Sequence, residues 1–134
     1  MKLKSLLIVG LVLTFAACKY EEGPNLSLRS KKARVAGNWY YYEYIENGKT
    51  TESNEDEKDL HWEFKKDGAF KLQRSSNQSD EGNWEFDDDK DSLIINFNAG
   101  GRVAYKIIKL KNKEMWLRIK GISSDIELHF KPAG

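Results

Sequence analysis

Gly37-Asn38-Trp39 and Gly82-Asn83-Trp84 are two copies of one short pattern, and each copy begins an alternating aromatic run. In both copies the tryptophan is followed two residues later by a second ring, Tyr41 or Phe86. Side chains at positions i and i+2 lie on one face of a β-strand, so each run predicts a strand with an aromatic face. The glycine leaves room where the backbone bends or where a large ring crosses the strand. The pair therefore favours an all-β domain.

Apolar and polar residues alternate with period two through the rest of the chain, which is typical of half-buried strands. We expect eight strands, at residues 38–45, 60–65, 70–72, 82–86, 93–97, 103–110, 115–119 and 126–131. The large residues expected to face inward are Trp62, Phe64, Phe70, Leu72, Trp84, Phe86, Leu93, Ile95, Phe97, Leu117, Ile119, Leu128 and Phe130.

Two places depart from simple alternation. The apolar face slips by one residue between Ile107 and Ile108, which predicts a β-bulge. After the Asn47-Gly48 turn signal, residues 49–59 contain many carboxylates and no large apolar side chain, so we expect a solvated loop there.

Short turns join most of these strands, which favours an antiparallel up-and-down meander. Eight such strands close into a barrel and leave no exposed edge. The alternative is an open sandwich of two sheets built from the same strands. An eight-stranded barrel is only just wide enough to be filled by side chains, so the many large inward residues leave little room for a ligand.

The first 17 residues have the features of a secretory signal peptide. Lys2 and Lys4 precede an uncharged stretch, residues 5–15, that is shorter than the ~20 residues needed to span a bilayer. Ala16-Ala17-Cys18 follows, and Cys18 is the only cysteine, so it forms no internal disulfide. We expect residues 1–17 to be the signal, 18–33 a tether containing a short basic helix, and 34–134 the domain.

Residues 15–18, Phe-Ala-Ala-Cys, resemble the lipobox of bacterial lipoproteins. The resemblance implies that Cys18 becomes the first mature residue and carries lipid, which three acyl chains would hold firmly on a membrane. Lys19, Glu21 and Glu22 resemble the acidic surface-export signal of Bacteroidota lipoproteins, which implies the outer membrane and either the cell surface or the periplasmic face. The other explanation is ordinary cleavage that leaves a free thiol.

The meander, the leader, the hairpin at residues 64–70 and the two glycine–tryptophan copies together resemble the bacterial lipocalin-like lipoproteins. This resemblance covers about residues 34–132 and implies a lipocalin/calycin-like barrel with a short N-terminal helix. In lipocalins a basic residue of the last strand packs on the first-strand tryptophan. The candidates for this barrel closure on Trp39 are Lys131 and then Arg118.

Catalytic and metal-binding patterns are weak. The two histidines, His61 and His129, fall on polar strand faces, where we expect them to be solvated. Asp87, Asp89 and Asp91 resemble the start of a calcium loop, but the required glycine and glutamate are missing, so a solvated turn is the simpler interpretation. We expect no enzyme activity, cofactor or metal. The mature chain carries 20 Lys and Arg against 21 Asp and Glu, which argues against a nucleic-acid partner.

Surplus aromatic residues give the remaining functional signal. By strand parity Tyr40, Tyr42, Tyr44 and Trp116 face away from the core, which makes them candidate ligand or partner contacts. The first hypothesis is a membrane-anchored lipocalin-like barrel that binds a small apolar ligand. The alternative is a filled barrel that docks a protein or glycan on its outer face.

Overall fold

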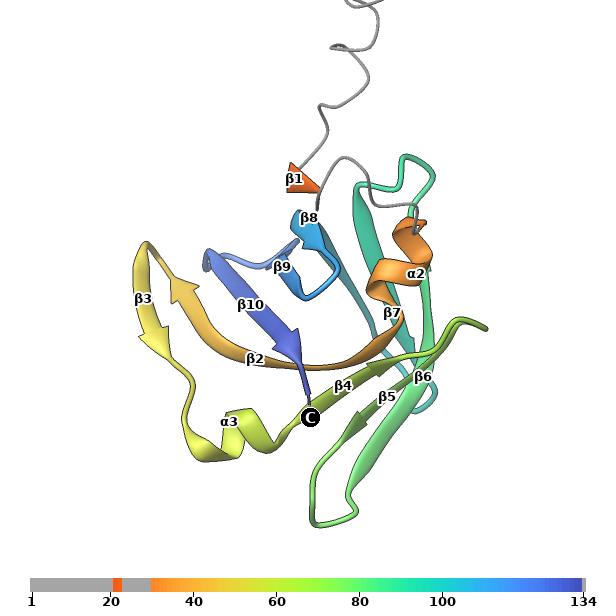
Figure 1. The fold of residues 1–134 in the computed structure, drawn as a ribbon, viewed down its shortest axis with the longest axis horizontal. Helices are drawn as coiled ribbons and strands as arrows, with labels where there is room; N and C mark the ends of the chain where they lie inside the picture. The colour runs from red at the N-terminus through yellow and green to blue at the C-terminus, as the bar shows by residue number, and fades with distance from the viewer. Residues whose placement is uncertain (1–20, 23–29, 134) are drawn as a thin grey trace, which may run out of the picture.

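The structure, a computed structural model, describes residues 21–22 and 30–133 (Figure 1). Within these residues two short helices accompany ten strands, and neither helix is long and apolar enough to cross a membrane. The predicted signal peptide and Cys18 lie outside the described residues. The elements are β1 (Glu21–Glu22), α2 (Lys31–Val35), β2 (Gly37–Glu46), β3 (Lys49–Glu52), α3 (Glu55–Asp59), β4 (His61–Phe64), β5 (Ala69–Gln73), β6 (Ser79–Phe86), β7 (Ser92–Phe97), β8 (Arg102–Lys111), β9 (Glu114–Ile119) and β10 (Ile126–Pro132).

Eight of the described strands form the predicted closed up-and-down barrel. Neighbours pair antiparallel in the order β2, β4, β5, β6, β7, β8, β9 and β10, and β10 pairs with β2 to close the cylinder. This closure rules out the open sandwich. β3 and β1 pair with barrel strands but are not among the eight that close the barrel. β3 pairs with the second half of β2, and β1 runs parallel to the end of β8.

The barrel interior is filled by rings and aliphatic side chains for most of its length. Trp62 is at its centre, with its ring centroid 5.0 Å from that of Phe130 and 5.9 Å from that of Tyr105. Phe64 and Phe70 meet below it at 4.9 Å. All thirteen residues predicted to face inward belong to the buried core or pack against it. Edge-to-face ring pairs of this kind add stability beyond the buried area.

α2 closes one end of the barrel. The Ser30 side chain caps it by accepting a hydrogen bond from the Ala33 N–H. Val35 is fully buried, and its carbonyl accepts a 2.8 Å hydrogen bond from Trp39 Nε1. Arg34 is also buried and donates from Nη1 to the Leu110 carbonyl at 3.3 Å. We call this end, with the turns at residues 65–68, 87–91 and 112–113, the closed end.

The barrel contains two bulges, of which the sequence predicted one. The register of β8 on β9 shifts between Ile107 and Lys109, where the apolar face slips. The second shift lies between β2 and β10, since His129 pairs with Glu43 and Phe130 with Tyr41. Tyr42 is left as the extra residue, and every side chain of β2 beyond it changes face.

The expectation of a loop over residues 49–59 is wrong, because the segment forms β3 and α3, although most of its side chains are exposed or half-buried. Asn47 and Gly48 have positive φ and form a hairpin turn between β2 and β3. α3 follows, and Asn54 with Glu57 forms a reciprocal capping box at its start. These local hydrogen bonds order a segment that has no large apolar residue.

The surroundings of Gly82 explain why the second Gly-Asn-Trp copy, residues 82–84, needs glycine at its first position. A Cβ atom at this position would lie 2.0 Å from the Asn96 carbonyl oxygen on β7, closer than any real contact. The close approach keeps Gly82 paired with Phe97 and places Trp84 inside the barrel.

Candidate functional site

The end of the barrel opposite α2 is its open mouth. The loops at residues 74–78, 98–101 and 120–125 lie there together with α3, while β1 and α2 lie at the closed end (Figure 1). The inward side chains near the mouth are only partly buried, unlike those below them. They are Tyr41, Tyr44, Leu60, Leu72, Phe97, Val103, Ile119 and Ile126.

A cavity of about 610 Å³ opens at this mouth between the β5–β6 and β7–β8 sides. Leu72 and Phe97 supply its apolar floor, and residues 79–81 and 98–100 form its polar rim. An adjoining cavity of about 320 Å³ shares Leu72 and adds Leu60. The site therefore lies above the filled core and does not penetrate it.

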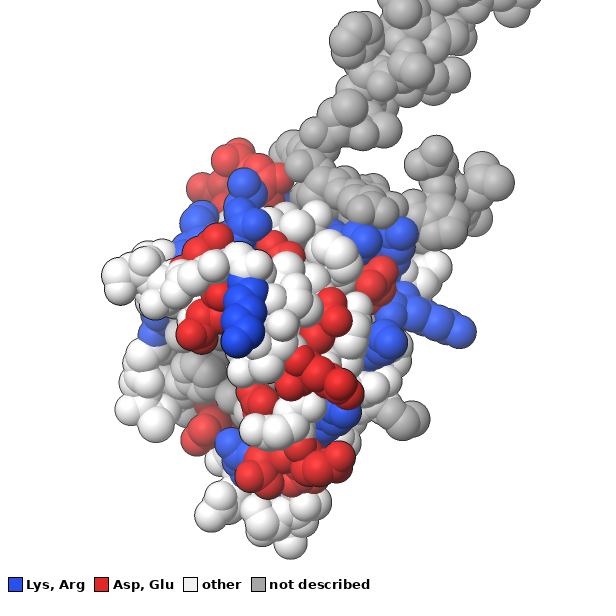
Figure 2. Space-filling model, turned by 90° about the vertical axis from the view of Figure 1, so that its left-hand side faces the viewer, with Lys and Arg blue, Asp and Glu red and all other residues white. Residues whose placement is uncertain are grey.

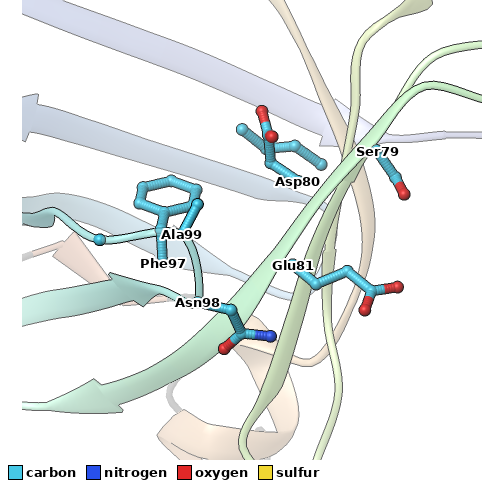
Figure 3. Close-up of a pocket in the computed structure, with 8 residues that line it drawn as sticks. Ser79, Asp80, Glu81, Phe97, Asn98 and Ala99 are labelled. Atoms are coloured by element: carbon cyan, nitrogen blue, oxygen red, sulfur yellow. The ribbon is translucent and has the colours of Figure 1, made fainter.

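Strand alternation sorts the rim residues of β6 by direction. Asp80 pairs with Leu72 and lies two residues before Gly82, so it occupies an inward position on the barrel wall. Figure 3 shows the Asp80 side chain on the same side of β6 as Phe97, whereas Ser79 and Glu81 point to the opposite side. One carboxylate thus stands beside the apolar floor, and its neighbour in sequence does not.

Tyr41 divides the other side of the mouth from the core. Its ring contacts Trp62 and Phe130 edge to face, and its hydroxyl donates a 3.0 Å hydrogen bond to Glu57 Oε2 on α3. Burial, followed by the Glu57 carboxylate, raises the pKa of the Tyr41 phenol far above its ordinary value. The contact holds α3 across part of the opening, over a smaller cavity of about 230 Å³ that Tyr44 and Leu128 help to line.

Tyr42 and Trp116 meet on the outer wall of the barrel and share one acceptor. The Tyr42 hydroxyl and Trp116 Nε1 both donate to Glu114 Oε2, at 3.3 and 3.1 Å. Burial, then the carboxylates of Glu114 and Glu43, raises the pKa of the Tyr42 phenol. The Tyr42 hydroxyl and the Trp116 N–H are therefore already hydrogen-bonded within the protein.

Both faces of the Trp116 ring are covered. His129 stacks on it with ring centroids 3.8 Å apart, and the Lys109 ammonium lies 3.8 Å from the ring centroid. A ring stacked at 3.8 Å fills one face, so the ammonium must occupy the other. Trp116 therefore offers no free aromatic platform to a partner.

The prediction that His129 is solvated is wrong. His129 is 2% exposed, and its Nδ1 and Nε2 lie 2.7 and 2.6 Å from carboxylate oxygens of Glu43 and Glu127. A neutral imidazole has one N–H, so the second short contact requires a further proton on the ring or on a carboxylate. We define the outer-wall network as Tyr42, Glu43, Lys109, Glu114, Trp116, Arg118, Glu127, His129 and Lys131.

The predicted closure of the barrel by Lys131 or Arg118 on Trp39 is also corrected. The Lys131 ammonium lies 4.2 Å from the Tyr42 ring centroid on the outer wall, and Arg118 Nη2 lies 2.9 Å from Glu127 Oε1. α2 holds Trp39 instead, through the Val35 carbonyl. Trp39 faces the barrel interior on β2. Strand alternation puts Arg118 of β9 and Lys131 of β10 on the outer face, away from Trp39.

The four candidate contact residues do not form one patch. Tyr42 and Trp116 are in the outer-wall network, and Tyr40 is half-buried opposite Lys131. Tyr44 faces inward, where it meets Tyr41 at 6.2 Å and lines the mouth. The prediction that Tyr44 faces outward is wrong because the Tyr42 bulge reverses the parity of the strand.

The Asp87–Asp91 segment is a turn closed by its own backbone. Asp87 Oδ1 accepts the N–H groups of Asp91 and Ser92, at 3.0 and 3.1 Å. Among the described residues, no group of three or more His, Cys, Asp or Glu is arranged to hold a metal ion.

The sequence analysis missed Asp80, Glu57 and the two carboxylates that contact His129, those of Glu43 and Glu127. The spacing of Asn54 and Glu57 is a capping-box signal that could have located α3. Asp80 shares the parity of Gly82 and Trp84, which could have assigned it to the inner wall. No local signal predicts the pairing of Glu43 with His129, because it depends on the bulge and on the closing of the barrel.

Comparisons with known proteins agree with this architecture. The lipocalin-like domain family matches residues 35–117, which is more than half of the chain. A lipocalin-like protein from Bacteroides uniformis ATCC 8492 is similar in structure at 15% identity and a TM-score of 0.56, covering 75% of this chain and 99% of that one. An uncharacterized protein from Bacteroides eggerthii DSM 20697 is similar at 18% identity and a TM-score of 0.55, covering 73% and 98%. No curated protein matches the sequence. The chain belongs to the lipocalin-like domain family.

Proposed function

We propose that this protein is a lipid-anchored binding protein of the outer membrane whose barrel mouth takes up a small, largely apolar ligand. The observation that carries this proposal is the half-buried floor of Leu72 and Phe97 above a filled core. Apolar side chains held open to solvent at a concave site gain free energy when a ligand covers them. A volume of about 610 Å³ fits a compact ligand of the size that such pockets usually hold.

The position of β1 supports an orientation for the anchored protein. Glu21 pairs with Lys109, close to the closed end, and lies only three residues after Cys18. Three extended residues span at most about 11 Å, so a lipid on Cys18 would hold the closed end near the bilayer. The mouth would then point away from the membrane, toward ligands in the aqueous phase.

The positions of the histidines support a binding role over an enzymatic one. His129 belongs to the outer-wall network, and His61 alternates with the inward Trp62, so neither of the chain's two histidines faces the mouth. The docking alternative is weakened by the covered faces of Trp116. A small-molecule site at the mouth is the better supported function.

Titration with the uncharged fluorophore N-phenyl-1-naphthylamine tests the ligand site. We expect saturable fluorescence enhancement with one site per chain. Leu72→Gln should weaken binding about tenfold, because it places an amide in the apolar floor. Lys71→Gln is the matched control, since residue 71 is on the opposite face of β5, and it should bind like wild type. Equal binding by both variants would contradict a site at the mouth.

Membrane anchoring is tested by expressing the full precursor in a Gram-negative host. The mature N-terminal peptide should begin at Cys18 with a diacylglyceryl group and an acyl chain, as read by mass spectrometry. Cys18→Ala removes the acceptor thiol and should release the protein from the membrane fraction. Membrane association that survives Cys18→Ala would contradict the lipid anchor.

A further inference from the structure

We propose that the ligand of the mouth is an amphiphile with a cationic head, such as a primary amine, which Asp80 pairs with while Leu72 and Phe97 cover its apolar body. This inference rests on the proposed ligand site and adds the chemical class of the ligand. The cavity and the placement of a single carboxylate on its inner wall carry it.

Asp80 is the carboxylate that shares a wall with the apolar floor. It pairs with Leu72 across β5 and β6, and it lines both the cavity of about 610 Å³ and the adjoining one of about 320 Å³. Its side chain lies on the Phe97 side of β6 in Figure 3. An apolar chain lying on Leu72 and Phe97 would therefore bring its head group to this carboxylate.

The Asp80 carboxylate is available for pairing. Among the described residues it makes no side-chain hydrogen bond or ion pair. Arg74 lines the adjoining cavity, but its Nη1 donates to the Asp56 carbonyl at 3.4 Å. Glu57, the carboxylate on the other side of the mouth, already accepts from Tyr41. Asp80 and Glu81 both line the larger cavity, but only Asp80 is on the side of the apolar floor, so a ligand cation would pair there.

The charge around the mouth favours a cation over an anion. The segments around the mouth contain nine carboxylates against five Lys and Arg. They are residues 46–59, 74–81, 98–102 and 120–125. Figure 2 shows carboxylates at the lower part of one face and also at its upper edge, with Lys and Arg side chains between them. A rim with an excess of one sign raises the local concentration of the opposite ion. Octanoate and other fatty acids would be disfavoured by the same field.

The experiment compares three probes with one chain length and different heads: octylamine, 1-octanol and octanoate, each titrated calorimetrically into the purified protein. Octylamine should bind about three- to fivefold more tightly than 1-octanol, the range expected for a solvated ion pair, and octanoate should bind most weakly. The advantage of the amine should shrink between low and 0.5 M salt because ions screen the pair.

Two variants decide whether Asp80 is responsible. Asp80→Asn should abolish the advantage of octylamine over 1-octanol and leave 1-octanol binding unchanged. Glu85→Gln makes the same charge change on the outward face of β6, at a residue that does not line the cavity, and it should keep the advantage. A similar loss in both variants, or equal binding of all three probes to the wild-type protein, would overturn the cationic ligand while the apolar site stands. Failure of all three probes to bind would overturn the site itself.

Discussion

The imidazole of His129 lies parallel to the indole of Trp116 on the outer wall, with ring centroids 3.8 Å apart and planes inclined by 11°. His129 also contacts Glu43 across the seam where the last barrel strand meets the first. Lys131 crosses the same seam to the Tyr42 ring. Residues that strand parity predicted to form a binding face therefore connect the first and last strands of the barrel, β2 and β10.

Replacing His129 with phenylalanine should keep the stacked ring and remove both nitrogen contacts. Glu43 and Glu127 would face each other without the imidazole between them, and Glu127 would keep only Arg118. Leaving a buried hydrogen-bonding group without its partner costs about 1–3 kcal/mol, and two carboxylates lose a contact here, so we expect a loss of about 2–3 kcal/mol. Urea unfolding measures the difference. His61→Phe, at a half-exposed position, should change stability by less than about 0.5 kcal/mol, and similar losses in both variants would refute the role of the network.

Gly82→Ala should destabilise the barrel by about 3 kcal/mol or more. The new methyl group would meet the Asn96 carbonyl oxygen at 2.0 Å, and both atoms belong to paired strands that cannot separate cheaply. Gly48→Asn is the control, since its turn is open and asparagine tolerates positive φ, and it should cost less than about 1 kcal/mol. Thermal unfolding followed by circular dichroism gives both values. A Gly82→Ala barrel as stable as Gly48→Asn would show that the close approach is relaxed in solution.

Alkaline pH should destabilise the protein partly through Tyr105. Burial raises the pKa of its phenol to about 12, so between pH 10 and 12 the unfolded chain releases a proton that the folded chain keeps. The folded state then binds more protons, and the free energy of unfolding falls by about 1.4 kcal/mol per pH unit from this group. Tyr105→Phe should make the fall between pH 10 and 12 shallower in urea titrations. Parallel slopes for the two proteins would contradict a buried phenol.

The barrel could be predicted from the sequence because its determinants are local. Alternation of rings with polar residues assigns the inner face of each strand, and the slip at Ile107 locates one bulge. Gly82 marks a backbone contact that only glycine fits. Each of these signals can be recognised within a few residues of chain.

The parts that depend on long-range pairing could not be predicted. The bulge at Tyr42 is a property of β2 against β10, nearly ninety positions apart, and it decides where Tyr44 and Glu43 point. The depth of filling around Trp62, which leaves a cavity at the mouth, depends on how rings from several strands interlock. Parity gives the face of a residue only along a strand without a bulge, and it does not give what the residue meets across the barrel.

The location of a bound apolar probe tests the central claim most directly. Backbone amide chemical shifts measured during a 1-octanol titration should move for residues 79–81 and 97–100 at the mouth. They should stay constant for Phe64 and Phe70 in the filled core, and for Trp116 on the outer wall. Shifts confined to the mouth would support a lipocalin-like protein that binds above its core. Shifts centred on the outer-wall network, or none at saturating probe, would contradict the account.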